Sequence, residues 1–137
     1  MQLYLTEKIF DKRTNFGTLL SMDLDDLKLK VYFYKTSAGT EPVRKWLKSL
    51  SPIQKKVLGE DIKTVQFGWP LGMPLVEKLK PFLWEIRSKI PDGIVRVLFT
   101  VDGNMMILLH GFIKKSQKIP KNELKTALSR LKEYQED

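Results

Sequence analysis

The chain contains no cysteine, a single histidine, and no apolar run long enough to cross a membrane. A disulfide framework and a thiolate metal site are therefore excluded, and one histidine is too few for an ordinary zinc site. The first residues lack the basic start and the long apolar core of a secretory signal. These absences predict a cytoplasmic protein that uses no metal and no cofactor and has no membrane partner.

Several catalytic motifs are also missing. The sequence has no glycine-rich phosphate loop, no dinucleotide fingerprint and no paired-histidine zinc motif. A two-metal nuclease needs several clustered carboxylates, and the second half of the chain has few of them. If the protein cleaves a nucleic acid, we expect it to do so without a metal ion.

Positive charge is what the sequence has in excess. The net charge is +8, and residues 78–132 carry 12 lysines and arginines against 4 carboxylates. This distribution favours a polyanionic partner such as RNA, DNA or an acidic protein. The alternative is a lysine-rich surface that serves only solubility.

Hydrophobic periodicity predicts an α+β fold. Residues 29–34 alternate as a half-buried strand, and two helices follow, the first capped by Thr40 and the second opened by a capping box at Ser51. Three further strands and a final helix after Pro120 complete the order β-α-α-β-β-β-α. The strands are expected at 82–87, 94–101 and 105–111.

Short turns between the last three strands imply an antiparallel sheet of about four strands, with the helices packed on one face. Residues 1–27 show no sustained period, so we interpret them as an appended segment before a domain at 28–137, with Met22 as an alternative start. The core is expected between helices and sheet, with Ile53 in the buried stripe of the second helix. Its members are Trp46, Leu47, Val57, Ile62, Trp84, Phe99, Leu124 and Leu128.

Charged side chains gather around the predicted sheet. Arg96 interrupts an apolar strand, where a charge must be paired or must reach a polar cleft. It either pairs with Glu85 on the neighbouring strand or belongs to a site with Arg87. His110 ends the last strand, and an imidazole exchanges protons near neutral pH. It is either structural or catalytic, and the lysines that follow are either a solvated loop or a polyanion site.

The order and spacing of these residues resemble those of a known protein family. Residues from about Val31 to Tyr134 resemble the phage Gp49-like branch of the HigB/RelE toxins of type II toxin–antitoxin systems. The matching stretches are Thr40-Glu41-Pro42-Val43 with Trp46-Leu47, Leu83-Trp84-Glu85-Ile86-Arg87, Arg96-Val97-Leu98-Phe99, and His110-Gly111-Phe112 followed by Lys114, Lys115, Lys118, Pro120, Ala127 and Arg130. The resemblance implies the RelE-like fold, which agrees with the order of elements above.

The resemblance also implies an activity: a metal-independent endoribonuclease that cleaves mRNA, commonly on the ribosome, and is silenced by a cognate helix-turn-helix antitoxin. On this basis we assign catalysis to Arg87, Arg96, His110 and Lys115, with His110 as our candidate for proton transfer and Glu85 as an alternative base. We assign nucleic-acid binding to Lys114, Lys118, Lys121 and Arg130. A non-catalytic relative that binds RNA or an antitoxin, and a phage structural protein, are the competing interpretations. The chain departs from the family at Ile119, where threonine is usual, and lacks a tyrosine between Lys118 and the last helix.

Overall fold

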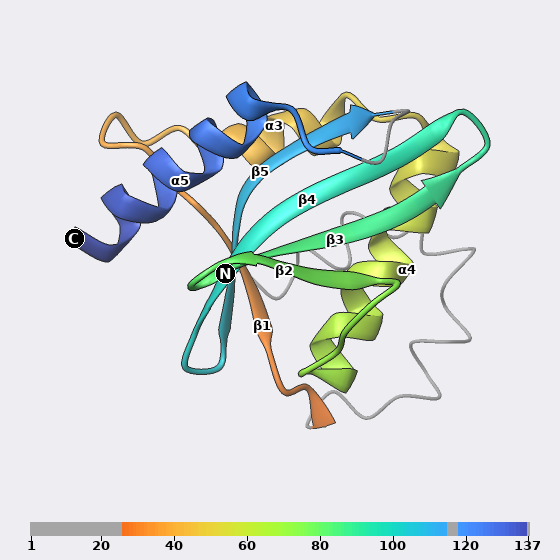
Figure 1. Ribbon diagram of the computed structural model, residues 1–137, viewed down its shortest axis with the longest axis horizontal. Helices are drawn as coiled ribbons and strands as arrows, with labels where there is room; N and C mark the ends of the chain where they lie inside the picture. Colours follow the sequence, from red (N-terminus) through yellow and green to blue (C-terminus); the bar gives the residue numbers. More distant parts are fainter. Residues whose placement is uncertain (1–25, 115–117, 137) are drawn as a thin grey trace.

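The computed structural model describes residues 26–114 and 118–136, and its elements follow the predicted order with one added strand (Figure 1). The α+β fold class is confirmed. The proposed boundary after residue 27 and the start at Met22 concern residues that lie almost wholly outside this range. The elements are β1 (Lys30–Phe33), α3 (Pro42–Lys48), α4 (Pro52–Gly68), β2 (Val76–Lys80), β3 (Leu83–Ile90), β4 (Gly93–Asp102), β5 (Met105–Lys114) and α5 (Lys121–Glu136).

The five strands form a single sheet in the order β1-β5-β4-β3-β2. Strands β2 to β5 are joined as an antiparallel meander, whereas β1 adds to its edge parallel to β5, with Lys30 opposite Met105. The prediction omitted β2, because three of its five residues are charged and only Val76 is buried. Such an edge strand lacks the apolar alternation that identifies a strand.

The helices do not share one face, so that expectation was wrong. Helices α3 and α4 pack against one face of the sheet, through residues such as Leu47 and Ile62. Helix α5 covers the other face through Ala127 and Leu131. The reason lies in β4, where residues 94–100 are all buried; a strand that buries both of its faces needs a layer on each side.

Most of the expected core residues do contribute to the two cores. Leu47, Ile62 and Phe99 are buried. Half-buried side chains pack against one core or the other, among them Trp46, Trp84, Leu124 and Leu128, and Val57 is also half-buried. Ile53 is 56% exposed, which corrects its place in the stripe. The buried residues of α4 begin only at Leu58, so the first turn of this helix does not reach the core.

Local capping signals were right for α4 and wrong for α3. The Ser51 hydroxyl accepts from the Gln54 amide, and the Gln54 side chain accepts from the Ser51 amide at 2.9 Å, which completes the capping box. Helix α3 instead begins after Glu41, which makes no side-chain cap. Thr40 is engaged elsewhere, because its hydroxyl lies 2.6 Å from that of Thr36 in the preceding turn.

A glycine on β5 sets how closely α3 approaches the sheet. A β-carbon added to Gly111 would overlap the ring of Trp46, so only glycine permits this packing. Gly111 follows His110 directly in the chain. Because side chains alternate across a strand, α3 supports the sheet from behind while His110 lies on the face that α5 covers.

Candidate functional site

The two strand arginines lie opposite each other on neighbouring strands. Arg87 of β3 and Arg96 of β4 are register partners in the antiparallel ladder, and such partners share a face. They share it with Leu83 and Leu98, which pack in the core beneath α5. The two guanidinium groups therefore belong to one side of the sheet, as expected for a shared site.

Carboxylates alternate with these arginines. Glu85 Oε2 lies 3.3 Å from Arg96 NH1, and its other oxygen lies 3.8 Å from Arg87 Nε. Arg87 also reaches Glu77 on β2, with 3.5 Å between NH1 and Oε1. The four residues form a charge ladder across three strands: Glu77, Arg87, Glu85 and Arg96.

Exposure divides the charge ladder into an inner and an outer half. The side chains of Glu85 and Arg96 are each 1% exposed, so Arg96 forms the buried ion pair that was one of its two predicted interpretations. Arg87 is 14% exposed and Glu77 43%, so a ligand meets these two first. Burial raises the pKa of the Glu85 carboxyl, and the charges of Arg96 and Arg87 oppose that shift.

His110 is held by two residues of α5. Its Nε2 lies 2.6 Å from Glu123 Oε1, and its Nδ1 lies 3.2 Å from Arg130 NH1. A guanidinium can only donate, so Nδ1 accepts, and the neutral ring therefore carries its proton on Nε2 and donates it to Glu123. Arg130 NH1 also donates to the Leu109 carbonyl at 2.9 Å, which ties the helix to the strand beneath the imidazole.

The spacing of Glu123 and Arg130 explains why both reach the same ring. They are seven positions apart on α5, close to two full turns, so they project from one face of the helix. Arg130 was expected to bind nucleic acid; its guanidinium contacts His110 and lies 5.7 Å from the centre of the Tyr34 ring. From this position Arg130 is at least as well placed to orient the His110 ring as to bind a phosphate.

The His110 group and the charge ladder lie on the same face of the sheet. Leu98 of β4 pairs with Glu85 on one side and with His110 on the other, so one strand separates the carboxylate from the imidazole. The rings of His110 and Phe112 are stacked with 5.8 Å between centroids, and Phe112 is the register partner of Arg96. Both groups thus lie on one face of the sheet between β2 and the first turn of α5, with the buried Leu98 between Glu85 and His110.

The lysines predicted for this site lie around the end of β5. Lys114 is half-buried at the last position of the strand, and Lys118 and Lys121 are exposed before and at the start of α5. Lys115 lies outside the described residues. The sequence reasoning missed Glu123, because an acidic residue in the first turn of a helix is ordinary. It missed Glu77 because β2 itself was not recognised.

The described segments hold no group of three or more residues of the metal-binding types. Within the same segments, no helix is both long and apolar enough to span a bilayer.

Comparison with known proteins adds one positive finding. No curated protein matches the chain. The model of the family described as "Phage derived protein Gp49-like (DUF891)" matches residues 45–132, a range that runs from within α3 into α5 and includes the charge ladder and the His110 group. That match covers well over half of the sequence. The chain therefore belongs to the phage-derived Gp49-like family, a family associated with toxin–antitoxin systems.

Proposed function

We propose that the protein is the toxin of a type II toxin–antitoxin system and acts as a metal-independent endoribonuclease on mRNA, engaged on the ribosome. The observation that carries the proposal is the shared sheet face, on which Arg87, His110 and Glu123 lie beside the lysines around the end of β5. Membership of a toxin–antitoxin family supports the same function.

RNA cleavage without a metal needs a fixed cation and groups that move protons. The ribose 2′-oxygen attacks the adjacent phosphorus, the bond from phosphorus to the 5′-oxygen breaks, and the products are a 2′,3′-cyclic phosphate and a free 5′-hydroxyl. One proton leaves the 2′-oxygen and one arrives at the 5′-oxygen. The transition state carries extra negative charge on the phosphate oxygens, which a positioned cation stabilises.

The exposed half of the site fits these requirements. Arg87 supplies the cation that faces solvent, and Arg96 acts through Glu85, whose carboxylate it holds against Arg87. Glu123 is 27% exposed and shares the Nε2 proton of His110. The His110–Glu123 pair takes up the proton of the 2′-hydroxyl and returns one to the leaving oxygen. The lysines around the end of β5 bind flanking phosphates, and these contacts do not depend on the RNA sequence.

Induced expression with mapping of mRNA 5′ ends tests the proposal. Expression of the full chain should arrest growth and create new 5′ ends, and a small helix-turn-helix protein encoded beside it should relieve the arrest. Arg87→Ala should remove the new ends while the protein stays folded. Lys56→Ala is the matched control, because it removes an exposed positive charge from α4 on the opposite face of the sheet. Equal cleavage by both variants would exclude Arg87 from the reaction.

One observation favours a second function, a non-catalytic relative that binds RNA or an antitoxin. Arg96 is paired with Glu85 in a buried ion pair, and both ring nitrogens of His110 make hydrogen bonds to residues of α5. Such a protein keeps RNA affinity that falls with salt but produces no new 5′ ends. The same mapping experiment, paired with an RNA-binding measurement, separates the two functions.

A further inference from the structure

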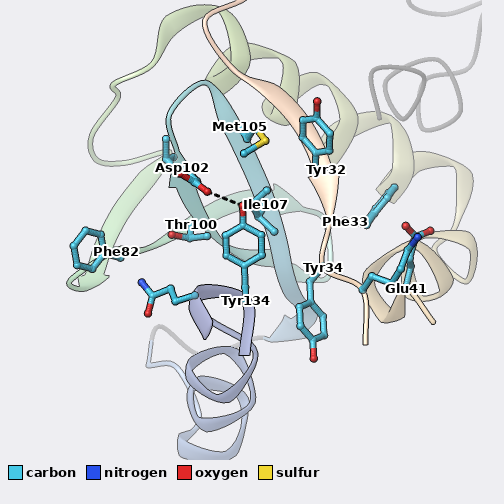
Figure 2. A pocket seen from close by; sticks show the side chains of 13 residues that line it. Tyr32, Phe33, Tyr34, Glu41, Phe82, Thr100, Asp102, Met105, Ile107 and Tyr134 are labelled. Carbon is cyan, nitrogen blue, oxygen red and sulfur yellow. Dashed lines mark hydrogen bonds between the residues drawn. The ribbon is translucent and has the colours of Figure 1, made fainter. Parts of the chain in front are cut away.

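A cavity of about 640 Å³ lies beside the C-terminal turn of α5, away from Glu123 in its first turn. Three of the chain's four tyrosines line it: Tyr32 and Tyr34 from β1, and Tyr134 from the last turn of α5. Figure 2 shows Tyr134 directed toward Asp102, with Phe82 on one side and the β1 residues on the other. Its volume is in the range of small-ligand sites, which are mostly apolar with a few placed polar groups.

Asp102 is the charged group of the cavity that can meet a positively charged ligand. Glu41 also lines the cavity but is paired with Arg44, and Lys35 is the one cation among the described lining residues. The hydroxyl of Tyr134 donates to Asp102 Oδ2 at 2.8 Å and so fixes that carboxylate at the wall. The C-terminal end of α5 also reaches the cavity, and none of the described residues of its last turn is basic. A helix end of this kind adds partial negative charge.

Two aromatic rings that line the cavity already contact guanidinium groups of the chain itself. The guanidinium carbon of Arg130 lies 5.7 Å from the centre of the Tyr34 ring, and that of Arg44 lies 4.6 Å from the centre of the Phe33 ring. Arg44 also pairs with Glu41 at 2.6 Å. Neither arginine is among the described residues that line the cavity, so each contacts its aromatic ring from outside the cavity.

The turn between β2 and β3 adds an independent observation. Phe82 has a φ of 63°, in the left-handed region that non-glycine residues rarely adopt, and its side chain is 59% exposed. Burial of the ring therefore does not offset the strain. Phe82 lines the cavity, and strained residues concentrate at ligand sites, where their position serves binding.

We infer that this cavity binds a guanidinium group. The planar cation lies against the tyrosine rings or the ring of Phe82, and its N–H groups donate to Asp102. The site goes beyond RNA cleavage, because Arg87, His110 and Glu123 are not among the described residues that line it and the Asp102 carboxylate at its wall disfavours a phosphate. The guanidinium comes either from a free small molecule or from an arginine of a peptide.

Calorimetric titration of the full chain tests the inference with matched probes. N-acetyl-arginine amide should bind saturably, and N-acetyl-citrulline amide, which has nearly the same shape but no charge, should bind at least tenfold more weakly. Asp102→Asn should weaken binding of the arginine probe roughly tenfold, because a charged hydrogen-bond partner is lost. Asp92→Asn is the control, since Asp92 is an exposed carboxylate outside the cavity and should leave binding unchanged.

Two further sets of titrations test the role of Phe82 and identify the source of the guanidinium. Phe82→Asn keeps a residue that tolerates positive φ and removes the ring, so it should weaken binding without loss of thermal stability. Agmatine represents a free ligand, and a short arginine-containing peptide represents a partner; the tighter binder identifies the source. Equal affinity for arginine and citrulline probes, absence of binding by every guanidinium probe, or preferential binding of a nucleoside would overturn the inference. No RNA is present, so the result does not depend on the proposed nuclease.

Discussion

Arg130 donates a hydrogen bond to Nδ1 of His110, and the same NH1 group donates to the carbonyl of Leu109. One guanidinium of α5 thus fixes both the tautomer of the imidazole and the backbone of the strand that carries it. Glu123 holds the other ring nitrogen, so both hydrogen bonds that orient the imidazole come from a helix that follows it in the chain.

Arg130→Ala should lower the free energy of unfolding by about 1–3 kcal/mol, because it leaves the Leu109 carbonyl and His110 Nδ1 without this donor. Lys132→Ala removes an exposed positive charge from the same helix and should change stability far less. Urea denaturation of both variants provides the comparison. If they unfold at the same urea concentration, the hydrogen bonds of Arg130 contribute no net stability.

The two strand arginines should differ in what their removal damages. Arg96→Ala leaves the Glu85 carboxylate buried without its 3.3 Å partner and should cost about 3–5 kcal/mol of stability. Arg87→Ala removes a partly exposed group, so the fold should persist while RNA cleavage falls about a hundredfold or more. Thermal unfolding and a cleavage assay on each variant test this division. A stable but inactive Arg96 variant would place that residue in the reaction directly.

Gly111→Ala should destabilise the domain by about 1–3 kcal/mol, because the added methyl group meets the ring of Trp46. Gly72→Ala is the matched control, since a β-carbon there would meet nothing within 4 Å. Thermal denaturation of both proteins measures the difference. Equal melting temperatures would mean that α3 can move away from β5 freely.

Tyr134 should ionise at unusually high pH. Burial, reinforced by the hydrogen bond and the charge of Asp102, raises the pKa of Tyr134 to about 12 from its ordinary value of 10.0. A raised folded-state pKa means that the corresponding stability is present below pH 10 and is lost as the pH rises toward 12. Ultraviolet titration of tyrosinate should show this late transition, and Tyr134→Phe should remove it. Asp102→Asn should move it to lower pH; an unchanged titration would exclude Asp102 as a cause.

Local signals in the sequence were sufficient where neighbouring residues decide the structure. The capping box at Ser51 needs only the next three residues, and the structure forms it. The pairing of Arg96 with Glu85 was also foreseeable, because both interrupt apolar positions of adjacent strands. The fold class follows from the same periodicities.

Information about tertiary packing was missing where the predictions failed. The continuous burial of residues 94–100 shows that β4 is covered on both faces, but nothing in that run says which helix lies on which side. The partnership of His110 with Glu123 and Arg130 depends on how α5 docks on β5, which no local pattern records. The aromatic cavity likewise joins β1, the β2–β3 turn and the end of α5, segments that are distant in sequence.

The parallel pairing of β1 with β5 imposes an order on biosynthesis. Lys30 pairs with Met105, so β1 leaves the ribosome long before the strand against which it docks has been made. Helix α4 and the hairpins from β2 to β4 have shorter-range partners and can assemble earlier, because their loops close at lower entropic cost, whereas α3 must wait for β5, where Trp46 packs against Gly111. His110 and α5 are synthesised later still. A prematurely terminated chain therefore lacks both its sheet edge and its imidazole, and the complete site arises only from a finished molecule.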